Sequence, residues 1–154
     1  HMRLVRRFGL SRAVAAATVD LMELLDGLRK AKTLKKDFKK SLGPVTYHAA
    51  CHLRAQKIAY PGLRVLGQVP DTEVRMVEQC SAVDGTWGMK REYFELSMKL
   101  AQPLFRDVGT AQAERVATDC PLAALQINQG TGRTAQHPIQ ILADAYGLTA
   151  HREG

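Results

Sequence analysis

A short β-favouring run, then a cysteine, then a helix-favouring segment is a pattern that occurs three times in this chain. The runs cover residues 45–48, 74–78 and 115–118, and the cysteines that follow them are Cys51, Cys80 and Cys120. Because long helical connections between strands are typical of βαβ units, the pattern predicts an α/β fold with a small parallel sheet and flanking helices. Parallel strands end at one shared edge, where ligands of such folds bind. We therefore expect the three cysteines to lie together at that edge.

Helical periodicity and turn residues predict the remaining elements. Apolar residues recur at helical spacing over residues 13–30, and residues 34–41 are predicted to form a short basic helix that ends before Gly43. The other predicted helices are residues 52–56, 89–104, 122–129 and 139–146, with Gly130 and Gly147 as stops. The chain is thus divided into an added N-terminal helical lead-in, residues 1–43, and a cysteine-rich domain, residues 44–150.

The net charge of +7 lies entirely in the first 40 residues, and residues 41–154 are neutral. A basic run of this kind is usually a solvated helix face, and contact with phosphate or an acidic partner is the alternative. Nucleic-acid binding is disfavoured because only Phe8 and Phe38 are interleaved with the basic residues. We interpret the lead-in as an interface element that lies outside the cysteine site.

The sequence contains no apolar run of the ~18 residues that a membrane span needs. Its basic start is not followed by the apolar core of a signal peptide. His1-Met2 is typical of a cloning remnant, so we expect the chain to be a piece of a longer protein. The expected location is the cytoplasm, with any membrane contact peripheral, at the inner face, or made through partners.

The three cysteines favour a metal–sulfur site. An odd number argues against a secreted disulfide framework. Cys51 and Cys120 are predicted at helix N-termini, where backbone N–H groups favour the thiolate that binds iron or zinc. Thiolates select an iron–sulfur cluster or zinc, and spacings of 29 and 40 residues are too wide for a zinc finger. Simple burial of each cysteine is the alternative interpretation.

Other side chains near the cysteines are weaker candidates. The residues considered as a fourth ligand are His48, His52 and His137. His137 is preferred because it precedes the proline that opens a predicted helix, although capping is the more common role of such a histidine. Trp87 is expected to pack or to shield the site from water, and Asp119 is expected to cap the helix that follows it. A hydrolytic pair of Cys120 with a histidine is a further alternative.

The residues around the cysteines resemble the cysteine-rich CCG domain, which occurs in the B subunit of heterodisulfide reductase and the C subunit of anaerobic glycerol-3-phosphate dehydrogenase. The segments that match are residues 45–54, 78–81, 84–88, 118–121, 130–132 and His137-Pro138. The resemblance covers roughly residues 40–147 and is closest to the glycerol-3-phosphate dehydrogenase-like branch. The family pattern is one cysteine, then Cys-Cys-Gly, then Cys-x-x-Cys. Here Ser81 and Ala123 replace two thiolates and Ala82 replaces the glycine, so the five-thiolate site cannot form.

The resemblance implies a role in electron transfer. It implies an iron–sulfur cluster, [4Fe–4S] or smaller, on Cys51, Cys80 and Cys120, with His137 as the candidate fourth ligand and zinc as the other metal considered. The domain would relay electrons between a flavin-containing dehydrogenase partner, or an upstream ferredoxin-like domain, and a quinone or thiol acceptor. The alternative is a degenerate, cluster-free or zinc-bound module that serves a structural or docking role in the same assembly.

Overall fold

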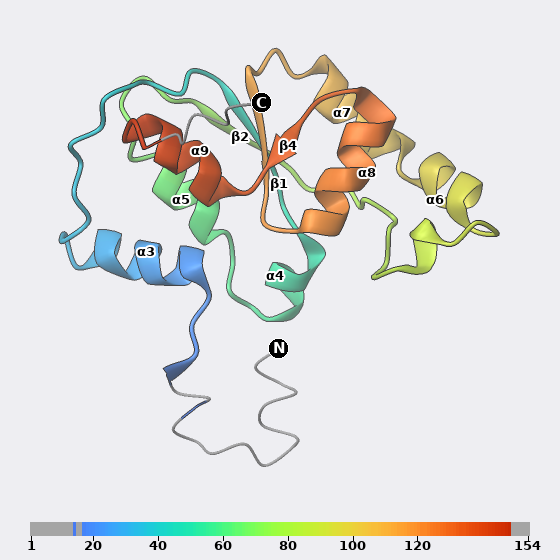
Figure 1. Cartoon of the computed structure of the whole chain (residues 1–154), viewed down its shortest axis with the longest axis horizontal. Coiled ribbons are helices and arrows are strands. Elements are labelled where there is room, and N and C mark those ends of the chain that lie inside the picture. The colour runs from blue at the N-terminus through green and yellow to red at the C-terminus, as the bar shows by residue number, and fades with distance from the viewer. Residues whose placement is uncertain (1–13, 15–16, 149–154) are drawn as a thin grey trace.

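A four-stranded parallel sheet forms the centre of the computed structural model, which describes Val14 and residues 17–148 (Figure 1). The strand order is β2–β1–β3–β4, and every neighbouring pair is parallel. The strands are β1 (Val45–His48), β2 (Val74–Val77), β3 (Arg115–Thr118) and β4 (Ala135–Gln136). The predicted α/β fold with a small parallel sheet is therefore confirmed.

Helices cover both faces of the sheet (Figure 1). They are α3 (Leu21–Lys30), α4 (Cys51–Ala55), α5 (Pro61–Leu66), α6 (Phe94–Leu100), α7 (Gln102–Thr110), α8 (Pro121–Thr131), α9 (Pro138–Ala145) and the short 3₁₀ helix η1 (Trp87–Met89). One apolar cluster joins α3, α5 and α9 to the sheet around the fully buried Tyr47, and a second joins α7 and α8 to it around Val116. None of the helices in this described part has the length and apolar character that a membrane crossing needs.

The helix predicted over residues 13–30 is interrupted, because Val14 and Ala17 are helical but residues 18–20 are not, and α3 begins at Leu21. Asp20 has an extended backbone, and its Oδ1 accepts a hydrogen bond from the N–H of Met22 at 2.8 Å. Such a side chain satisfies backbone donors that a helix start leaves free. The part of the prediction that falls on residues 13, 15 and 16 lies outside the described residues.

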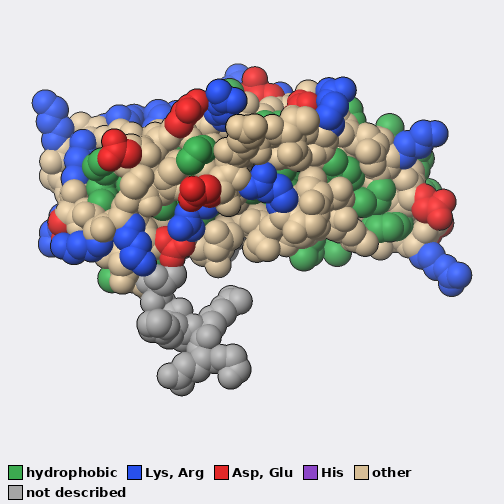
Figure 2. Space-filling model, turned by 90° about the horizontal axis from the view of Figure 1, so that it is seen from above, with side chains coloured by type: hydrophobic (Ala, Val, Ile, Leu, Met, Phe, Trp, Pro, Cys, Tyr) green, Lys and Arg blue, Asp and Glu red, His purple; other side chains and the backbone are tan. Residues whose placement is uncertain are grey.

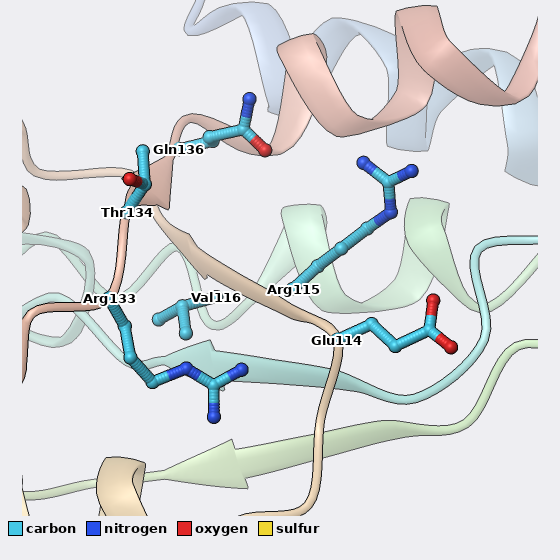
Figure 3. A pocket seen from close by; sticks show the side chains of 6 residues that line it. All are labelled: Glu114, Arg115, Val116, Arg133, Thr134 and Gln136. Atoms are coloured by element: carbon cyan, nitrogen blue, oxygen red, sulfur yellow. The ribbon is translucent and has the colours of Figure 1, made fainter.

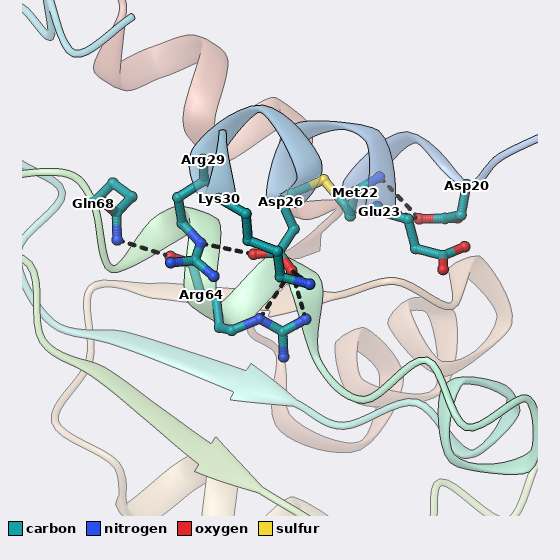
Figure 4. A network of polar contacts seen from close by, with 8 residues as sticks. All are labelled: Asp20, Met22, Glu23, Asp26, Arg29, Lys30, Arg64 and Gln68. Atoms are coloured by element: carbon teal, nitrogen blue, oxygen red, sulfur yellow. Dashed lines mark hydrogen bonds and ion pairs between the residues drawn. The ribbon is translucent and has the colours of Figure 1, made fainter. Parts of the chain in front are cut away.

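A buried carboxylate joins α3 to α5 (Figure 4). Asp26 is 2% exposed and contacts three cations, with Arg29 at 2.7 Å, Arg64 at 2.8 Å and Lys30 at 3.1 Å. Burial alone raises the pKa of Asp26, but hydrogen bonds from Arg64, Arg29 and Lys30 outweigh it and hold the pKa well below its usual range. Since Met22 on the same helix is fully buried, α3 shares the core of the sheet domain.

The predicted helix over residues 34–41 is also wrong, because this segment is irregular. Its backbone bonds go to α9 instead: the N–H groups of Lys39 and Lys40 both donate to the carbonyl of Ala145. The ring of Phe38 packs on Tyr146 with centroids 4.7 Å apart. Tertiary contacts with α9 therefore override the local helix preference of this lysine-rich segment.

The long helix predicted over residues 89–104 is interrupted. It divides into η1, α6 and α7. Helix α6 ends at Leu100 because Pro103, the second residue of α7, lacks the backbone N–H that a continuous helix would need there. The apolar side chains that recur at helical spacing in this segment are largely solvent-exposed, with Leu96 49% and Leu100 55% exposed, whereas Leu104 is buried.

Gly130 does not end α8, contrary to the prediction. The helix continues to Thr131 and ends at Gly132, which has a left-handed backbone with φ 68°. Gly130 instead provides close approach between helices, because a Cβ on it would lie 2.3 Å from the ring of Phe105. Residues 130 and 131 thus belong to the end of α8, and Gly132 caps it.

Candidate functional site

A cavity of about 710 Å³ brings the three cysteines together at the carboxyl edge of the sheet. The strands that precede them are neighbours, and their ends are level, since His48 pairs with both Val77 and Thr118. Each cysteine follows its strand within three residues, so all three reach the same edge. The thiols share this cavity with mostly apolar neighbours, which include Ala50, Val83, Trp87, Leu100 and Leu122.

Backbone N–H groups contact two of the three thiols, those of Cys80 and Cys120. Cys51 is the first residue of α4, and Cys120 is the N-cap of α8, where its sulfur accepts from the N–H of Ala123 at 3.5 Å. The sulfur of Cys80 accepts from the N–H of Ala82 at 3.3 Å. Among the described residues, no group of three or more His, Cys, Asp or Glu side chains is arranged to hold a metal ion.

His52 lines the same cavity as Cys120. A hydrogen bond between the two side chains lowers the pKa of Cys120 and raises the pKa of His52. Backbone N–H groups at the start of α8 also lower the pKa of the Cys120 thiol, whereas partial burial opposes both shifts. The surroundings of Cys120 therefore favour its thiolate form.

His48 also lines the cavity, but both of its ring nitrogens are engaged. Its Nε2 lies 3.0 Å from the carbonyl of Gln79 and must donate, because a carbonyl oxygen only accepts. Its Nδ1 lies 3.0 Å from the hydroxyl of Thr118, which then donates to it. Burial lowers the pKa of His48, which favours its neutral form. Its two hydrogen bonds connect the ends of β1, β2 and β3, so neither ring nitrogen is free to bind a metal.

His137 caps a helix, which was the alternative to its predicted role as the fourth ligand. Its Nδ1 accepts from the N–H of Ile139 at 3.2 Å, and the side chain of Gln140 accepts from the His137 N–H at 3.0 Å. This reciprocal pair is a capping box at the start of α9. In the part of the chain that the structure describes, His137 is not among the residues that line the cysteine cavity.

Asp119 does not cap α8, contrary to the prediction, because Cys120 is the N-cap. The Asp119 carboxylate instead accepts a hydrogen bond from the hydroxyl of the buried Tyr47 on β1. Burial raises the pKa of Asp119. This contact links the residue after β3 to β1 at the centre of the sheet.

The loop that follows Cys80 depends on two buried polar side chains that sequence reasoning missed. Ser97 on α6 donates to the carbonyl of Ala82 at 2.8 Å and accepts from Nε2 of Gln126 on α8 at 2.7 Å. Ala82 has a left-handed backbone with φ 55°, which explains why glycine suits this position. Trp87 in the same loop lines the cavity and stacks on Tyr93 at 4.9 Å.

A second cavity, of about 480 Å³, lies at the opposite edge of the sheet (Figure 3). Two arginines line it, but both are engaged: Arg133 donates to the carbonyls of Ala111 and Ala113, and Arg115 donates to Asp144 at 2.7 Å. Their guanidinium groups point away from each other in Figure 3. On the face drawn in Figure 2, Lys and Arg side chains lie among Asp and Glu side chains, so this face has mixed charge.

Fold and cavity together define a small parallel α/β domain with three cysteines around one cavity at the carboxyl edge of the sheet. The chain is 34% identical over 102 residues to the C subunit of anaerobic glycerol-3-phosphate dehydrogenase from Escherichia coli strain K12, and equally so to that of Escherichia coli O157:H7. The matched segment is 66% of this chain and 26% of each relative, so the chain spans about a quarter of these proteins. This similarity supports a family link with these dehydrogenase subunits. No family model and no solved structure matches the chain.

Proposed function

We propose that this chain is an electron-transfer domain of an oxidoreductase and that Cys51, Cys80 and Cys120 hold an iron–sulfur cluster in the cavity. The observation that carries the proposal is the convergence of three cysteines, from three separate strand–helix junctions, on one cavity. Thiolates are the ligands that iron–sulfur clusters take in proteins. A largely apolar lining also suits a redox group, because solvent access and local hydrogen bonds set its potential.

The donor set fits a cluster better than zinc. A structural zinc ion needs four ligand atoms at about 2.0–2.3 Å from one centre, and no group of described residues is arranged to hold an ion in this way. A cluster distributes its cysteine ligands over several iron atoms, so its thiolates stand further apart around a larger space. Three thiols around a cavity of about 710 Å³ fit that requirement.

The resemblance to the CCG domain gains support from two residues that are not cysteines. Ser81 and Ala123 occupy the positions where the family pattern has its other thiolates, and both line the same cavity as the three cysteines. All five positions of the pattern therefore surround one space. A cluster held by three of five thiolates would have an iron without protein sulfur, and it would be more labile than the cluster of a five-cysteine relative.

The role follows from the relatives and from the ligand chemistry. The similar proteins are parts of a dehydrogenase by name, so the chain would work beside a dehydrogenase partner. A bound cluster supplies a one-electron carrier. The domain would receive electrons from a flavin-containing partner, or from an upstream ferredoxin-like domain, and pass them toward a quinone or thiol acceptor. We place it in the cytoplasm, with membrane contact only through its periphery or its partners.

A structural module without a cluster is the second candidate, and the loss of two thiolates at Ser81 and Ala123 favours it. In that case the domain would keep the fold and its contacts with partner proteins but would carry no electrons. Zinc binding at the remaining thiols belongs to this second candidate.

Anaerobic reconstitution of the chain with ferrous iron and sulfide distinguishes these functions. We expect bound iron, acid-labile sulfide and a visible spectrum that bleaches on reduction. The variant Cys80→Ser should lose most of this iron, whereas His137→Gln, whose side chain caps α9, should keep it. Zinc without sulfide, or no metal at all in the parent chain, would contradict the proposal. Loss of iron in His137→Gln would restore this histidine as a ligand.

A further inference from the structure

Helix α3 carries apolar side chains on two faces. Met22 is buried in the core of the sheet domain, and Leu25 packs against the same core. Leu21, Leu24 and Leu28 recur at helical spacing and are 45%, 47% and 38% exposed. Side chains with this spacing lie on one face of a helix. The helix therefore presents to solvent a row of three leucines, which we call the leucine face.

A glycine lies beside the leucine face. Gly27 is exposed, and a Cβ built on it would have open space around it in the described part of the chain. Glycine weakens a helix interior relative to alanine, and no contact inside this domain requires its small size. Ala31 follows Gly27 one turn later, at the end of the helix. These small residues leave room for a second helix to approach α3 along its leucines.

The charges beside the leucine face select an antiparallel second copy of this chain as the partner. Glu23 lies in the first turn of α3 and Lys30 in the last, and both are on the flank that carries Gly27. The Lys30 side chain is 66% exposed, and Glu23 forms no ion pair with the described residues. In an antiparallel two-fold pair these flanks meet, so the Glu23 of each helix lies opposite the Lys30 of the other. A parallel pair would set this flank against the opposite one, and the charges would not meet.

We propose that the leucine face is the interface of a two-fold symmetric dimer of this chain, in which two α3 helices pack antiparallel. A two-fold contact uses the same surface on both chains, which a self-complementary face allows. A helix of ten residues is about 15 Å long, so the contact is small and belongs to the weak, reversible class. No residue of α3 lines the cysteine cavity, and the dimer does not depend on the proposed iron–sulfur function.

Sedimentation equilibrium of the full chain tests the interface. A reductant in the buffer keeps the exposed thiols of Cys51 and Cys80 from linking chains. We expect a monomer–dimer equilibrium with a dissociation constant of about 1–100 µM. Leu24→Glu should raise this constant about 30-fold or more, because it places a charge at the centre of the apolar contact. Leu21→Gln, a milder change, should raise it by a smaller factor.

The matched control is Leu96→Glu. Leu96 is 49% exposed on α6, which lies on the opposite side of the molecule from α3 (Figure 1). This variant should keep the parent dissociation constant. A parent chain that is monomeric throughout the concentration range overturns the proposal, and so do equal losses in Leu24→Glu and Leu96→Glu. A Leu21→Gln chain with the parent circular dichroism that dimerises as tightly as the parent overturns it as well.

Charge reversal tests the antiparallel orientation. Glu23→Lys places like charges opposite each other at both ends of the contact and should raise the dissociation constant about 3- to 10-fold at low salt. Glu95→Lys, at an exposed glutamate of α6, changes the net charge equally and should have no effect. Equal dissociation constants in these two variants overturn the antiparallel dimer. Iron uptake by a chain that stays monomeric would overturn this inference and leave the proposed function standing.

Discussion

Replacement of Ser97 by alanine tests how the loop that carries Cys80 is held. Ser97 is fully buried, and its hydroxyl connects the Ala82 carbonyl at 2.8 Å with the side-chain amide of Gln126 at 2.7 Å. The change removes this partner from the side-chain amide of Gln126, which is only 4% exposed, and from the carbonyl of the half-buried Ala82. Each unsatisfied buried group costs about 1–3 kcal/mol. We therefore expect Ser97→Ala to lower the free energy of unfolding by about 2–4 kcal/mol.

Urea unfolding followed by circular dichroism measures this loss, with Ser41→Ala as the matched control. The Ser41 hydroxyl also donates to a carbonyl, that of Asp71 at 3.0 Å, but it is exposed to water. Its removal should cost only about 0.5 kcal/mol. Ser97→Ala should also speed alkylation of Cys80 relative to Cys51, because the loop residue Ala82 that donates to the Cys80 sulfur loses its anchor. Equal losses in the two serine variants would refute the reasoning.

Three further changes have expected outcomes. In urea titrations Gly130→Ala, whose methyl would lie 2.3 Å from a buried phenylalanine ring, should lower the free energy of unfolding by about 1–3 kcal/mol. Gly27→Ala, its control, has open space and should raise it by up to about 1 kcal/mol, and the same sign for both would contradict the helix packing. Because the pKa of Asp26 is lower in the folded chain than in the unfolded chain, its contribution is complete above about pH 4 and is lost as pH falls further. Asp26→Asn should therefore reduce the loss of unfolding free energy at low pH. An unchanged decrease of the unfolding free energy below about pH 4 would count against this ion-pair network. Ser81→Cys combined with Ala123→Cys should raise the iron bound per chain after anaerobic reconstitution, and no gain over the parent would mean that thiolate number is not limiting.

The strands were predictable because their signal is local. Residues 45–48 and 115–118 are β-favouring runs, and the structure has strands with these bounds. Helix limits were less predictable because they depend on contacts between distant segments. The 34–41 segment is held against α9 by backbone hydrogen bonds to the Ala145 carbonyl, and the periodicity of the segment itself cannot predict these bonds.

The gathering of the cysteines could be predicted because parallel strands share a carboxyl edge, and the cavity contains all three. Their role as ligands stays a prediction. The partner of Cys120 could not be selected from the sequence, since His52 and His137 flank strands or helices in similar ways. The register of β1 against β3 places His52 near Cys120, because it brings the residues after His48 next to those after Thr118. Ser97 carried no signal, since a lone serine within a helix is usually solvent-exposed.

The wide spacing of the cysteines along the chain has a consequence for folding. A group bound to Cys51, Cys80 and Cys120 would close two loops, of 29 and 40 residues, and so restrict the unfolded chain. By the chain-entropy relation used for disulfides, each closure removes about 3–4 kcal/mol of unfolded-state entropy at room temperature. Ligand binding and folding are then one equilibrium. A chain that lost such a bound group would therefore unfold at a lower temperature.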